Sequence, residues 1–430
     1  MAPPSNHRAR LGWCLYDWAN SAFATVILAA VLPVYFAALV PATGAVLYLP
    51  WGVRSMPASA LWGYAVSLSM LLVAIAAPAL GALADRRGVR RRLLITCCLL
   101  GSLATMLLAA TGPGDYLLVA LLFVIANIGF AAGNIFYNAF LPALASGPDL
   151  DRLSAQGYAL GYIGGGLVLL TVFLFISFPT ALGLADTASA SRAGFLLTGL
   201  WWLGFALPTF AWVREEACLR APATLVRGFR GYCRTFSDIL RCRDLALFLL
   251  AFLFYNDGIQ TVIAVSAIFG REELGLSQTT ILGTFLMIQF VAMPGSLLFG
   301  RLAARYGARQ AILLSLLLFL AMTVYAFRMQ QAWEFWVLGL VVALILGGSQ
   351  AISRSLFASL IPPGKNAEFF GFYAISGKFA SILGPLVFAA IADLTGSTRL
   401  SILALSAFFL IGLVLLLAVN VDRGRSKAQA

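Results

Sequence analysis

One carboxylate in this sequence stands where water should be scarce. Asp257 lies about twelve residues into the apolar run 245–269, with Asn256 beside it and Gln260 one helical turn away from Asn256. At a helical rise of about 1.5 Å per residue, that depth is near the middle of a bilayer. An ionisable side chain there is costly unless it has a partner or a function. Asp257 is our first candidate for binding a proton or a cation; the alternative is a permanent pair with a neighbouring helix.

Two basic residues occupy comparable positions in later apolar runs. Lys378 is about ten residues into the run 369–393, so its ammonium group can reach toward the membrane surface only partway. We expect it to contact a carboxylate, either of a bound molecule or of the protein, with Asp257 or Asp17 as natural partners. Arg354 lies nearer the end of its run, where it would act as a gate charge or anchor the interface.

Asp17 and Asn20 lie near the start of the first apolar run. Their spacing of three residues places both on one face of a helix. Asp17 is flanked by Trp13, Tyr16 and Trp18, a composition typical of the membrane interface, so a cap or gate role is the favoured interpretation. Asn20 lies deeper and aligns with Asn256 in an internal repeat. We therefore expect Asn20 to line a polar cavity.

The run 117–138 carries three asparagines on one helical stripe. Asn127, Asn134 and Asn138 are spaced so that they follow one another along the same face. Three amides on a membrane helix need partners. They would either line a polar cavity, in which case Asn134 and Asn138 are the wall residues, or form hydrogen bonds to other helices. Each such bond would stabilise helix packing by about 1 kcal/mol.

The elements that must position these residues are membrane helices. Hydrophobic residues make up 61% of the 430 residues and charged residues only 11%, which excludes a soluble globular protein. About twelve runs are long enough to span a bilayer as helices, and their continuous apolar character excludes a barrel. They lie near 15–40, 62–83, 93–111, 117–138, 156–178, 194–213, 245–269, 279–299, 311–328, 334–357, 369–393 and 400–420.

The residues behind the net charge of +12 are distributed unequally between the two sides of the membrane, so the charge need not indicate a nucleic-acid partner. With the amino terminus inside, 22 of the 29 Lys and Arg residues fall on one side of the membrane. This asymmetry predicts a multi-pass protein of the inner or plasma membrane with both termini in the cytoplasm.

Two short basic loops of the same design lie 219 residues apart and indicate a duplicated chain. In each, the second glycine follows the first by seven residues. The residues of the first loop are Gly81, Asp85, Arg86, Gly88, Arg90 and Arg91; those of the second are Gly300, Arg305, Gly307 and Arg309, with Ala304 at the position of the aspartate. The repeat predicts a six-helix bundle over 1–213, a cytoplasmic linker over 214–243 and a second bundle over 244–430. Two such halves are the plan of transporters whose substrate binds midway between them.

The first loop resembles the G-x-x-x-D-R-x-G-x-R-R signature of the major facilitator superfamily. The segments Tyr16–Ala24, Ser353–Phe357, Phe369–Tyr373 and Ser376–Phe379 resemble more narrowly the branch related to fungal autophagy-associated vacuole effluxers, over nearly the whole chain. The resemblance implies an all-α integral membrane fold of twelve helices in two pseudo-symmetric bundles and, from the fungal members, amino-acid efflux. It also implies that the basic loops form a conformational latch, with Asp85 engaging the second half; the alternative is that their arginines only set topology.

Catalytic, metal-binding and phosphate-binding motifs are not recognisable in the sequence. We expect no enzyme activity, no cofactor and no metal. The duplicated halves and the family resemblance together predict a secondary transporter that moves a small molecule, such as an amino acid or other zwitterion, by alternating access and coupled to H⁺. Membrane lipids and the substrate are the expected partners, without nucleic acid, and one chain suffices. The alternatives are transport of a lipid-like or hydrophobic compound, and a non-transporting receptor or scaffold.

Overall fold

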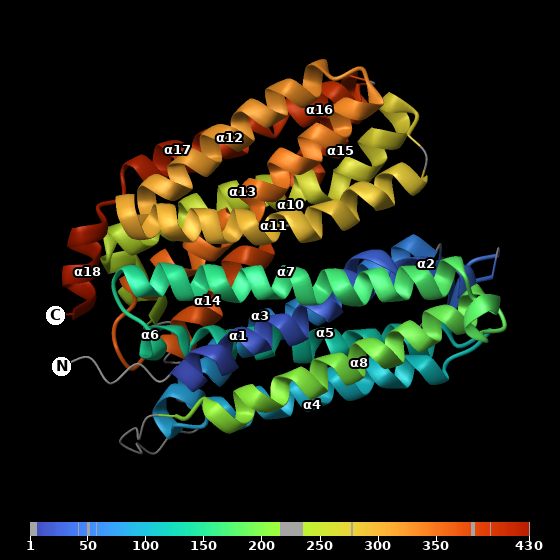
Figure 1. The fold of residues 1–430 in the computed structure, drawn as a ribbon, viewed down its shortest axis with the longest axis horizontal. Coiled ribbons are helices and arrows are strands. Elements are labelled where there is room, and N and C mark those ends of the chain that lie inside the picture. The colour runs from blue at the N-terminus through green and yellow to red at the C-terminus, as the bar shows by residue number, and fades with distance from the viewer. Residues whose placement is uncertain are drawn as a thin grey trace. The chain divides into compact units, whose positions relative to one another are not determined.

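A computed structural model describes residues 7–41, 43–49, 52–56, 58–215, 235–276, 278–379, 383–395 and 397–429. These ranges are almost entirely helical (Figure 1). The first half contains α1 (His7–Ala22), the π-helical segment η1 (Phe23–Ala30), α2 (Leu32–Leu39), strands β1 (Ala45–Leu49) and β2 (Gly52–Met56), α3 (Ala58–Arg87), α4 (Arg90–Leu107), the turn η2 (Leu108–Ala110), α5 (Tyr116–Asn138), α6 (Leu141–Leu144), α7 (Pro148–Ser177), the turn η3 (Thr180–Leu182) and α8 (Thr187–Trp212).

The second half is also mostly helical over its described residues. It contains α10 (Arg243–Leu274), α11 (Gln278–Tyr306), α12 (Ala308–Arg328), α13 (Ala332–Leu360), α14 (Asn366–Phe379), α15 (Leu383–Thr395), α16 (Thr398–Ala404), α17 (Ser406–Leu417) and α18 (Val421–Gln429). Residues 235–241 form a short helix before α10.

The predicted all-α membrane fold is confirmed. Within the described residues, nine helices are long and apolar enough to cross a bilayer, and the bent pair 7–30 and 32–39 would make a tenth. The two remaining predicted runs correspond to α3 and to α14 with α15, whose apolar stretches adjoin or contain residues outside the description.

The first predicted helix differs from a single straight span. The sequence predicts one helix over 15–40, whereas the structure has α1, η1 and α2, with a bend of 41°. The Val31 N–H reaches back five residues to the Val26 carbonyl at 2.9 Å, the pattern of a π-helix. Pro33 follows in the first turn of α2 and has no amide to continue the ladder. The bend therefore arises locally, where a π-turn and a proline interrupt the regular hydrogen bonds of the helix.

Aliphatic side chains face outward along the long helices, as expected of lipid-exposed surfaces. On α4, Leu99, Leu103 and Leu107 recur every fourth residue and are all exposed. The same helix buries small residues such as Gly101 and Ser102 on its inner side. Exposed leucines and buried small residues reverse the arrangement found in helices of soluble proteins. A helix bundle surrounded by hydrocarbon requires this arrangement.

The chain divides into two compact units. One comprises residues 1–77, 88–137 and 163–217, and the other comprises 78–87, 138–162 and 218–430. Two segments of the first half, 78–87 and 138–162, thus group with the second half. The division into 1–213, 214–243 and 244–430 stays a prediction.

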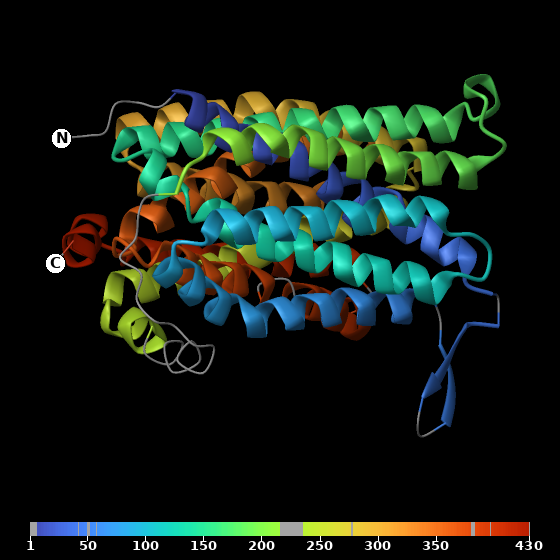
Figure 2. The same cartoon turned by 90° about the horizontal axis from the view of Figure 1, so that it is seen from below.

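The first unit is held by close helix approaches at small residues. The Thr209 hydroxyl of α8 donates to the Gly12 carbonyl of α1 at 2.6 Å. A Cβ on Gly101 of α4 would overlap the Trp202 ring of α8. Within this unit, β1 and β2 pair antiparallel in the loop before α3, with Ala45 opposite Met56 (Figure 2).

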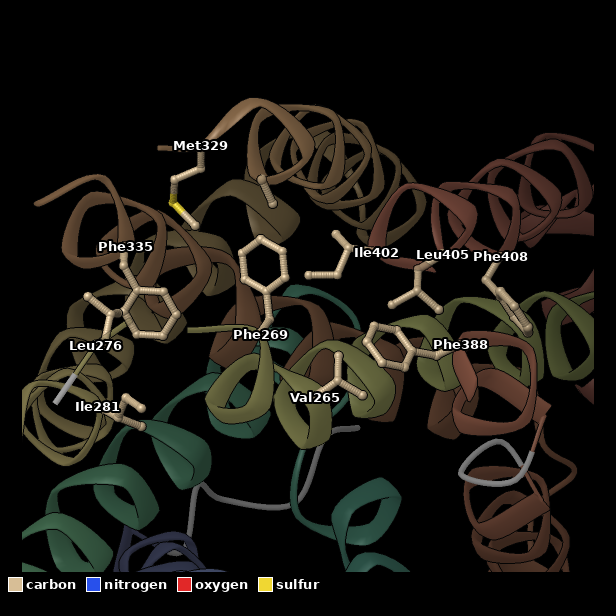
Figure 3. Packing of buried hydrophobic residues seen from close by; sticks show 11 residues of the cluster. Val265, Phe269, Leu276, Ile281, Met329, Phe335, Phe388, Ile402, Leu405 and Phe408 are labelled. Atoms are coloured by element: carbon tan, nitrogen blue, oxygen red, sulfur yellow. The ribbon is translucent and has the colours of Figure 1, made fainter. Parts of the chain in front are cut away.

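The second unit has an apolar core where α10, α13, α15, α16 and α17 meet. Figure 3 shows Phe269 of α10 close to Ile402, and Phe388 of α15 facing Leu405 and Phe408. Nearby, α11 and α13 approach so closely that a Cβ on Gly295 would overlap the Leu344 backbone. This packing fixes α10, the helix that carries Asp257.

Candidate functional site

The Asp257 side chain is buried in the second unit and bonds to the backbone of α15. Its Oδ2 accepts the backbone N–H of Gly384 at 2.9 Å, and the residue has no solvent exposure. Its Oδ1 is buried and, among the described residues, has no hydrogen-bond partner. The predicted mid-membrane carboxyl thus bonds to the backbone of α15.

Asn256 bonds to the backbone on the other side of residues 380–382. Its Nδ2 donates to the Gly377 carbonyl of α14 at 3.4 Å, and only 5% of the residue is exposed. Two adjacent residues of α10 therefore hold a carbonyl near the end of α14 and an amide at the start of α15.

Thr261 completes the surroundings of Asp257. Its hydroxyl donates to the Asp257 backbone carbonyl at 2.7 Å, one helical turn earlier. A Cβ on Gly384 would overlap Thr261 Oγ1 and would lie 2.8 Å from Asp257 Oδ1. Glycine at position 384 therefore permits α15 to approach both oxygens.

Gln260 and Lys378 were predicted to belong to the same site. Gln260 is half-buried on α10, one turn from Asn256. Lys378 lies in the last turn described for α14, next to Gly377, but its side chain is outside the described residues. Its pairing with Asp257 or Asp17 stays a prediction.

Two amides predicted to line a cavity are bonded to each other in the first unit. Asn20 Nδ2 donates to Asn134 Oδ1 at 2.7 Å, joining α1 to α5. Asn20 is buried, and Asn134 and Asp17 are half-buried. Nearby on the stripe, Asn127 donates to Ser69 Oγ at 2.8 Å. The stripe on α5 thus bonds to two different helices.

Arg354 is buried in the second unit among residues of 138–162. Its Nε donates to Ser154 Oγ and its Nη2 to the Ser154 carbonyl, both at 2.9 Å. Its Nη1 donates to Asn138 Oδ1 at 3.3 Å, and the guanidinium lies 4.3 Å from the Tyr158 ring centroid. With 3% exposure, Arg354 does not lie at a solvated interface.

The same segment of α7 is bonded to α13 by further polar contacts. Ser355 donates to Asp151 Oδ1, and the Ser154 hydroxyl donates to the Ala351 carbonyl at 2.6 Å. A Cβ on Gly300, from the second basic loop, would overlap Ala155. The start of α7 is therefore fixed against α11 and α13.

Asp85 of the first basic loop caps α14. Its two carboxylate oxygens accept the backbone N–H groups of Ala367 and Glu368, each at 3.0 Å, and the side chain is buried. A Cβ on Gly81 would lie 2.5 Å from the Ala367 carbonyl oxygen, so glycine permits this approach. Charge-assisted bonds at a helix amino terminus are a strong form of capping.

The short helix 235–241 bonds to the same end of α14. The Thr235 hydroxyl donates to Glu368, and the Lys365 ammonium lies 3.1 Å from Asp238 Oδ2. Lys365 is half-exposed, so its ion pair contributes little to stability. The first turn of α14 thus meets both α3 and the linker.

The remaining latch residues shape the loops or bind helix ends. Gly88 and Gly307 have positive φ angles of 60° and 99° and begin the turns into α4 and α12. The Arg90 backbone N–H donates to Glu215 Oε1 at 2.7 Å. Arg305 is exposed beside the Tyr306 ring, and nothing is described of the Arg86 side chain.

One arginine in each loop binds carbonyls at the end of the last long helix of its own half. Arg91 Nη2 donates to the Phe210 carbonyl of α8, and Arg309 Nε donates to the Leu416 carbonyl of α17 at 3.1 Å. Cations are favourable at helix carboxyl ends because the last carbonyls lack intrahelical partners. The two loops therefore share a structural role.

Sequence reasoning did not identify Ser154, Thr261 or Gly384 as site residues. Gly384 is a repeat marker, lying 220 residues after Gly164, and this coincidence was a usable signal. The sequence gives no such signal for Ser154 and Thr261, because serine and threonine are common in membrane helices, where their hydroxyls bond to the backbone.

Comparison with known proteins identifies the chain's relatives. The family model described as "Vacuole effluxer Atg22 like" matches residues 5–429. The uncharacterized MFS-type transporter YxiO of Bacillus subtilis is 34% identical over 419 residues, covering 97% of this chain and 96% of YxiO. Autophagy-related protein 22-1 of Penicillium rubens is 25% identical over 554 residues, covering 99% of this chain and 92% of the fungal protein.

Solved structures agree on the fold. The human organic anion transporter MFSD10 matches with a TM-score of 0.74 at 15% identity, covering 96% of this chain and 100% of that one. FucP in its outward conformation matches with a TM-score of 0.72 at 12% identity, covering 96% and 98%. The chain belongs to the vacuole effluxer Atg22-like family and is a multi-pass membrane transporter of small molecules with the major facilitator fold, not an enzyme.

Proposed function

We propose that this protein is a proton-coupled secondary transporter of a zwitterionic small molecule, such as an amino acid, by alternating access. The observation that carries the proposal is the buried Asp257 carboxyl with an oxygen free of described partners. A buried carboxyl with spare bonding capacity in a transporter is a candidate ion-binding group. The family's description as effluxers favours export.

The residues near Asp257 suit a zwitterion. Asn256 and Gln260 offer amide donors and acceptors, and Lys378 supplies a cation on the neighbouring α14. An ammonium for the substrate carboxylate and amide or carboxyl oxygens for its amino group are the complementary chemistry. In this proposal Asn20, Asn134 and Asn138 belong to the wall contributed by the first half, and Asp17 is a second ion-binding candidate.

The proposed latch consists of two contacts that segments of the first half make with the second. Asp85 caps α14, and Arg354 is bonded to Ser154 and Asn138. Opening these contacts would release 78–87 and 138–162 from α13 and α14. We place the latch, both termini and the linker on the cytoplasmic side of the inner or plasma membrane, and expect a monomer.

A second candidate substrate is a hydrophobic compound. A small apolar pocket lies beside the core of the second unit, lined by residues of α10, α12 and α13 that include Phe269, Phe319 and Leu338. Apolar cavities accept apolar ligands. Competition between a hydrophobic compound and amino acids for flux would distinguish the two substrate classes.

The test is flux into liposomes containing the purified full-length chain. Amino acids, peptides, lipids and drugs are first screened by thermal shift, and stabilising compounds are then measured as radiolabelled flux at two pH values. Substrate flux that depends on pH in the wild type and loses this dependence in Asp257→Asn supports the proposal. Asp422→Asn, an exposed aspartate on α18, is the matched control. The absence of flux for every stabilising compound would favour the receptor or scaffold alternative.

A further inference from the structure

The helix α18 lies at one end of the second unit and packs against α10 and α13 (Figure 1). It begins directly after Asn420, whose side-chain oxygen accepts the Arg423 backbone N–H at 2.9 Å. Before it, the end of α17 is bonded by Arg309 of the second basic loop, which donates to the Leu416 carbonyl at 3.1 Å. α18 therefore starts from a fixed point of the unit.

Asp244, in the first turn of α10, binds α18 with both carboxylate oxygens. Arg423 donates from Nε to Oδ2 and from Nη2 to Oδ1, each at 2.7 Å. The Asn420 backbone N–H also donates to Oδ1, at 2.9 Å. The Asp244 side chain has no exposed surface, although 47% of the Arg423 side chain is exposed. Paired, charge-assisted bonds to a buried carboxylate are stronger contacts than an ion pair between two exposed side chains.

The same turn of α18 contacts the end of α13. Gly424 is buried, and a Cβ on it would lie 2.7 Å from Leu360 Cδ2 and 3.3 Å from Asp244 Cβ. Arg425 Nε donates to Ser359 Oγ at 3.3 Å. Glycine at position 424 thus lets α18 touch two helices at once. α18 thereby joins the start of α10 to the end of α13.

α13 is also attached to α10 directly, one turn before its contact with α18. The hydroxyl oxygens of Tyr255 and Ser353 lie 2.6 Å apart, and both residues are buried. Arg354 and Ser355, which bond α13 to the start of α7, come next on α13. These two residues therefore lie between two attachments of α13 to α10, and loss of either attachment would give them more freedom to move.

α18 also acts on α7, the partner of this part of α13. Asp151 of α7 accepts the Ser355 hydroxyl, and Arg425 is close enough for its positive charge to act on the Asp151 carboxyl. Opposite charges attract, so this interaction favours the arrangement in which α7, α13 and α18 lie together.

We propose that α18 is a conformational brace: docked on Asp244 and on the end of α13, it holds Arg354 and Ser355 in position to bond α7. Release of α18 weakens the bonds between α13 and α7. The inference rests on the proposed function in one respect, that the Arg354 contacts of the proposed latch open during transport. The brace itself depends on neither the substrate nor the coupling ion.

Hydrogen–deuterium exchange of the full-length protein in lipid nanodiscs tests the brace with two different variants. Arg423→Ala removes both side-chain bonds to Asp244. Gly424→Leu retains the arginine and inserts a side chain that overlaps Leu360. In both variants, exchange should rise in peptides from α18, from the end of α13 and from the start of α7. Loss of bonds to a charged group should raise the exchange of the affected amides by about 10-fold or more.

Lys427→Ala is the matched control, because Lys427 is an exposed cation on the same helix whose charge also reaches Asp244. Its exchange should stay near that of the wild type. Arg423→Lys separates charge from geometry, since lysine keeps the charge but cannot form two parallel bonds. Its exchange should lie between those of the wild type and Arg423→Ala. Arg423→Lys and Gly424→Leu keep the comparison available if Arg423→Ala is unstable.

The exchange result decides this inference separately from the proposed function. A rise at the end of α13 and at the start of α7, in Arg423→Ala and Gly424→Leu but not in Lys427→Ala, supports the brace. A rise confined to α18, or an equal rise in Lys427→Ala, overturns it. A wild-type protein without flux for any compound would contradict the proposed function and would leave the exchange result unaffected.

Substrate flux in liposomes provides the second measurement. If the brace opposes opening of the Arg354 contacts, substrate exchange across the membrane should be severalfold faster in Gly424→Leu than in the wild type and unchanged in Lys427→Ala. Unchanged flux in a Gly424→Leu variant whose α7 amides exchange faster would overturn the role of the brace in transport.

Discussion

Asp85 Oδ1 accepts the backbone N–H of Ala367 at 3.0 Å, although 282 residues separate the two in the chain. The second carboxylate oxygen takes the next amide of α14, so one side chain satisfies two of the amides that a helix amino terminus leaves unpaired. The segment 78–87 is thereby attached to a helix of the second half. Neither partner amide carries any signal in the sequence.

Asp85→Ala should loosen the first turn of α14. Losing a capping side chain costs about 0.5–2 kcal/mol, so exchange of the Ala367 and Glu368 amides should rise by roughly 2- to 30-fold. Hydrogen–deuterium exchange of peptides covering 366–370 measures this change, with Asp422→Ala as the control. Unaltered exchange in Asp85→Ala would contradict the role of Asp85 in stabilising the first turn of α14.

Arg354→Lys should destabilise the protein although it keeps the charge. Lysine cannot reproduce the two bonds to Ser154 together with the stack on Tyr158, and an unmade bond to a buried charged group costs about 1.5–3 kcal/mol. The melting temperature in detergent should therefore fall by several degrees.

Arg305→Lys is the matched control for this substitution. Arg305 is exposed and lies on the second basic loop, so the change should leave the melting temperature near that of the wild type. Equal melting temperatures for the two variants would exclude a structural role for the Arg354 contacts.

Gly384→Ala should be damaging because of a single added methyl group. A Cβ there overlaps Thr261 Oγ1 and lies 2.8 Å from Asp257 Oδ1, and such overpacking costs about 1–3 kcal/mol. Gly377→Ala, on the other side of residues 380–382, is the control because its Cβ would lie at least 3.6 Å from its neighbours. Thermal stability and flux should both fall in Gly384→Ala and not in Gly377→Ala. Equal losses in both variants would contradict the steric explanation.

Stability should depend on pH through Asp186, which precedes α8 outside the membrane spans. The Ser189 backbone N–H and hydroxyl hold the pKa of this carboxyl below its usual range. A carboxyl with a lowered folded-state pKa stabilises above its unfolded pKa, and this stabilisation disappears as pH falls through the folded value. The melting-temperature difference between wild type and Asp186→Asn should therefore be present at neutral pH and vanish in acid. A difference that persists at low pH would assign it to another cause.

The membrane helices could be predicted because each requires about 20 consecutive apolar residues, a purely local property. The helix over 15–40 was predicted too simply, since the backbone bond from Val31 to Val26 and the bend before Pro33 depend on where the hydrogen-bond ladder fails. The hairpin of β1 and β2 was not predicted, because its pairing depends on the register of two short strands within a loop.

The candidate site was predictable in its residue types but not in its partners. Burial cost alone singled out Asp257 and Arg354, because charges in apolar runs are rare. Their partners are a backbone amide 127 residues away and a serine 200 residues away, and neither has a composition or spacing that marks it. The bond between Asn20 and Asn134 likewise depends on which helices meet, which only tertiary packing decides.

The most direct test of the central claim is substrate flux driven by a pH gradient into liposomes, compared between wild type, Asp257→Asn and Asp422→Asn. The account predicts that wild type and Asp422→Asn accumulate substrate in response to the gradient. Asp257→Asn should still exchange substrate between the two sides but should lose gradient-driven accumulation. Accumulation by Asp257→Asn at the wild-type level would contradict the assignment of Asp257 as the proton-coupling group.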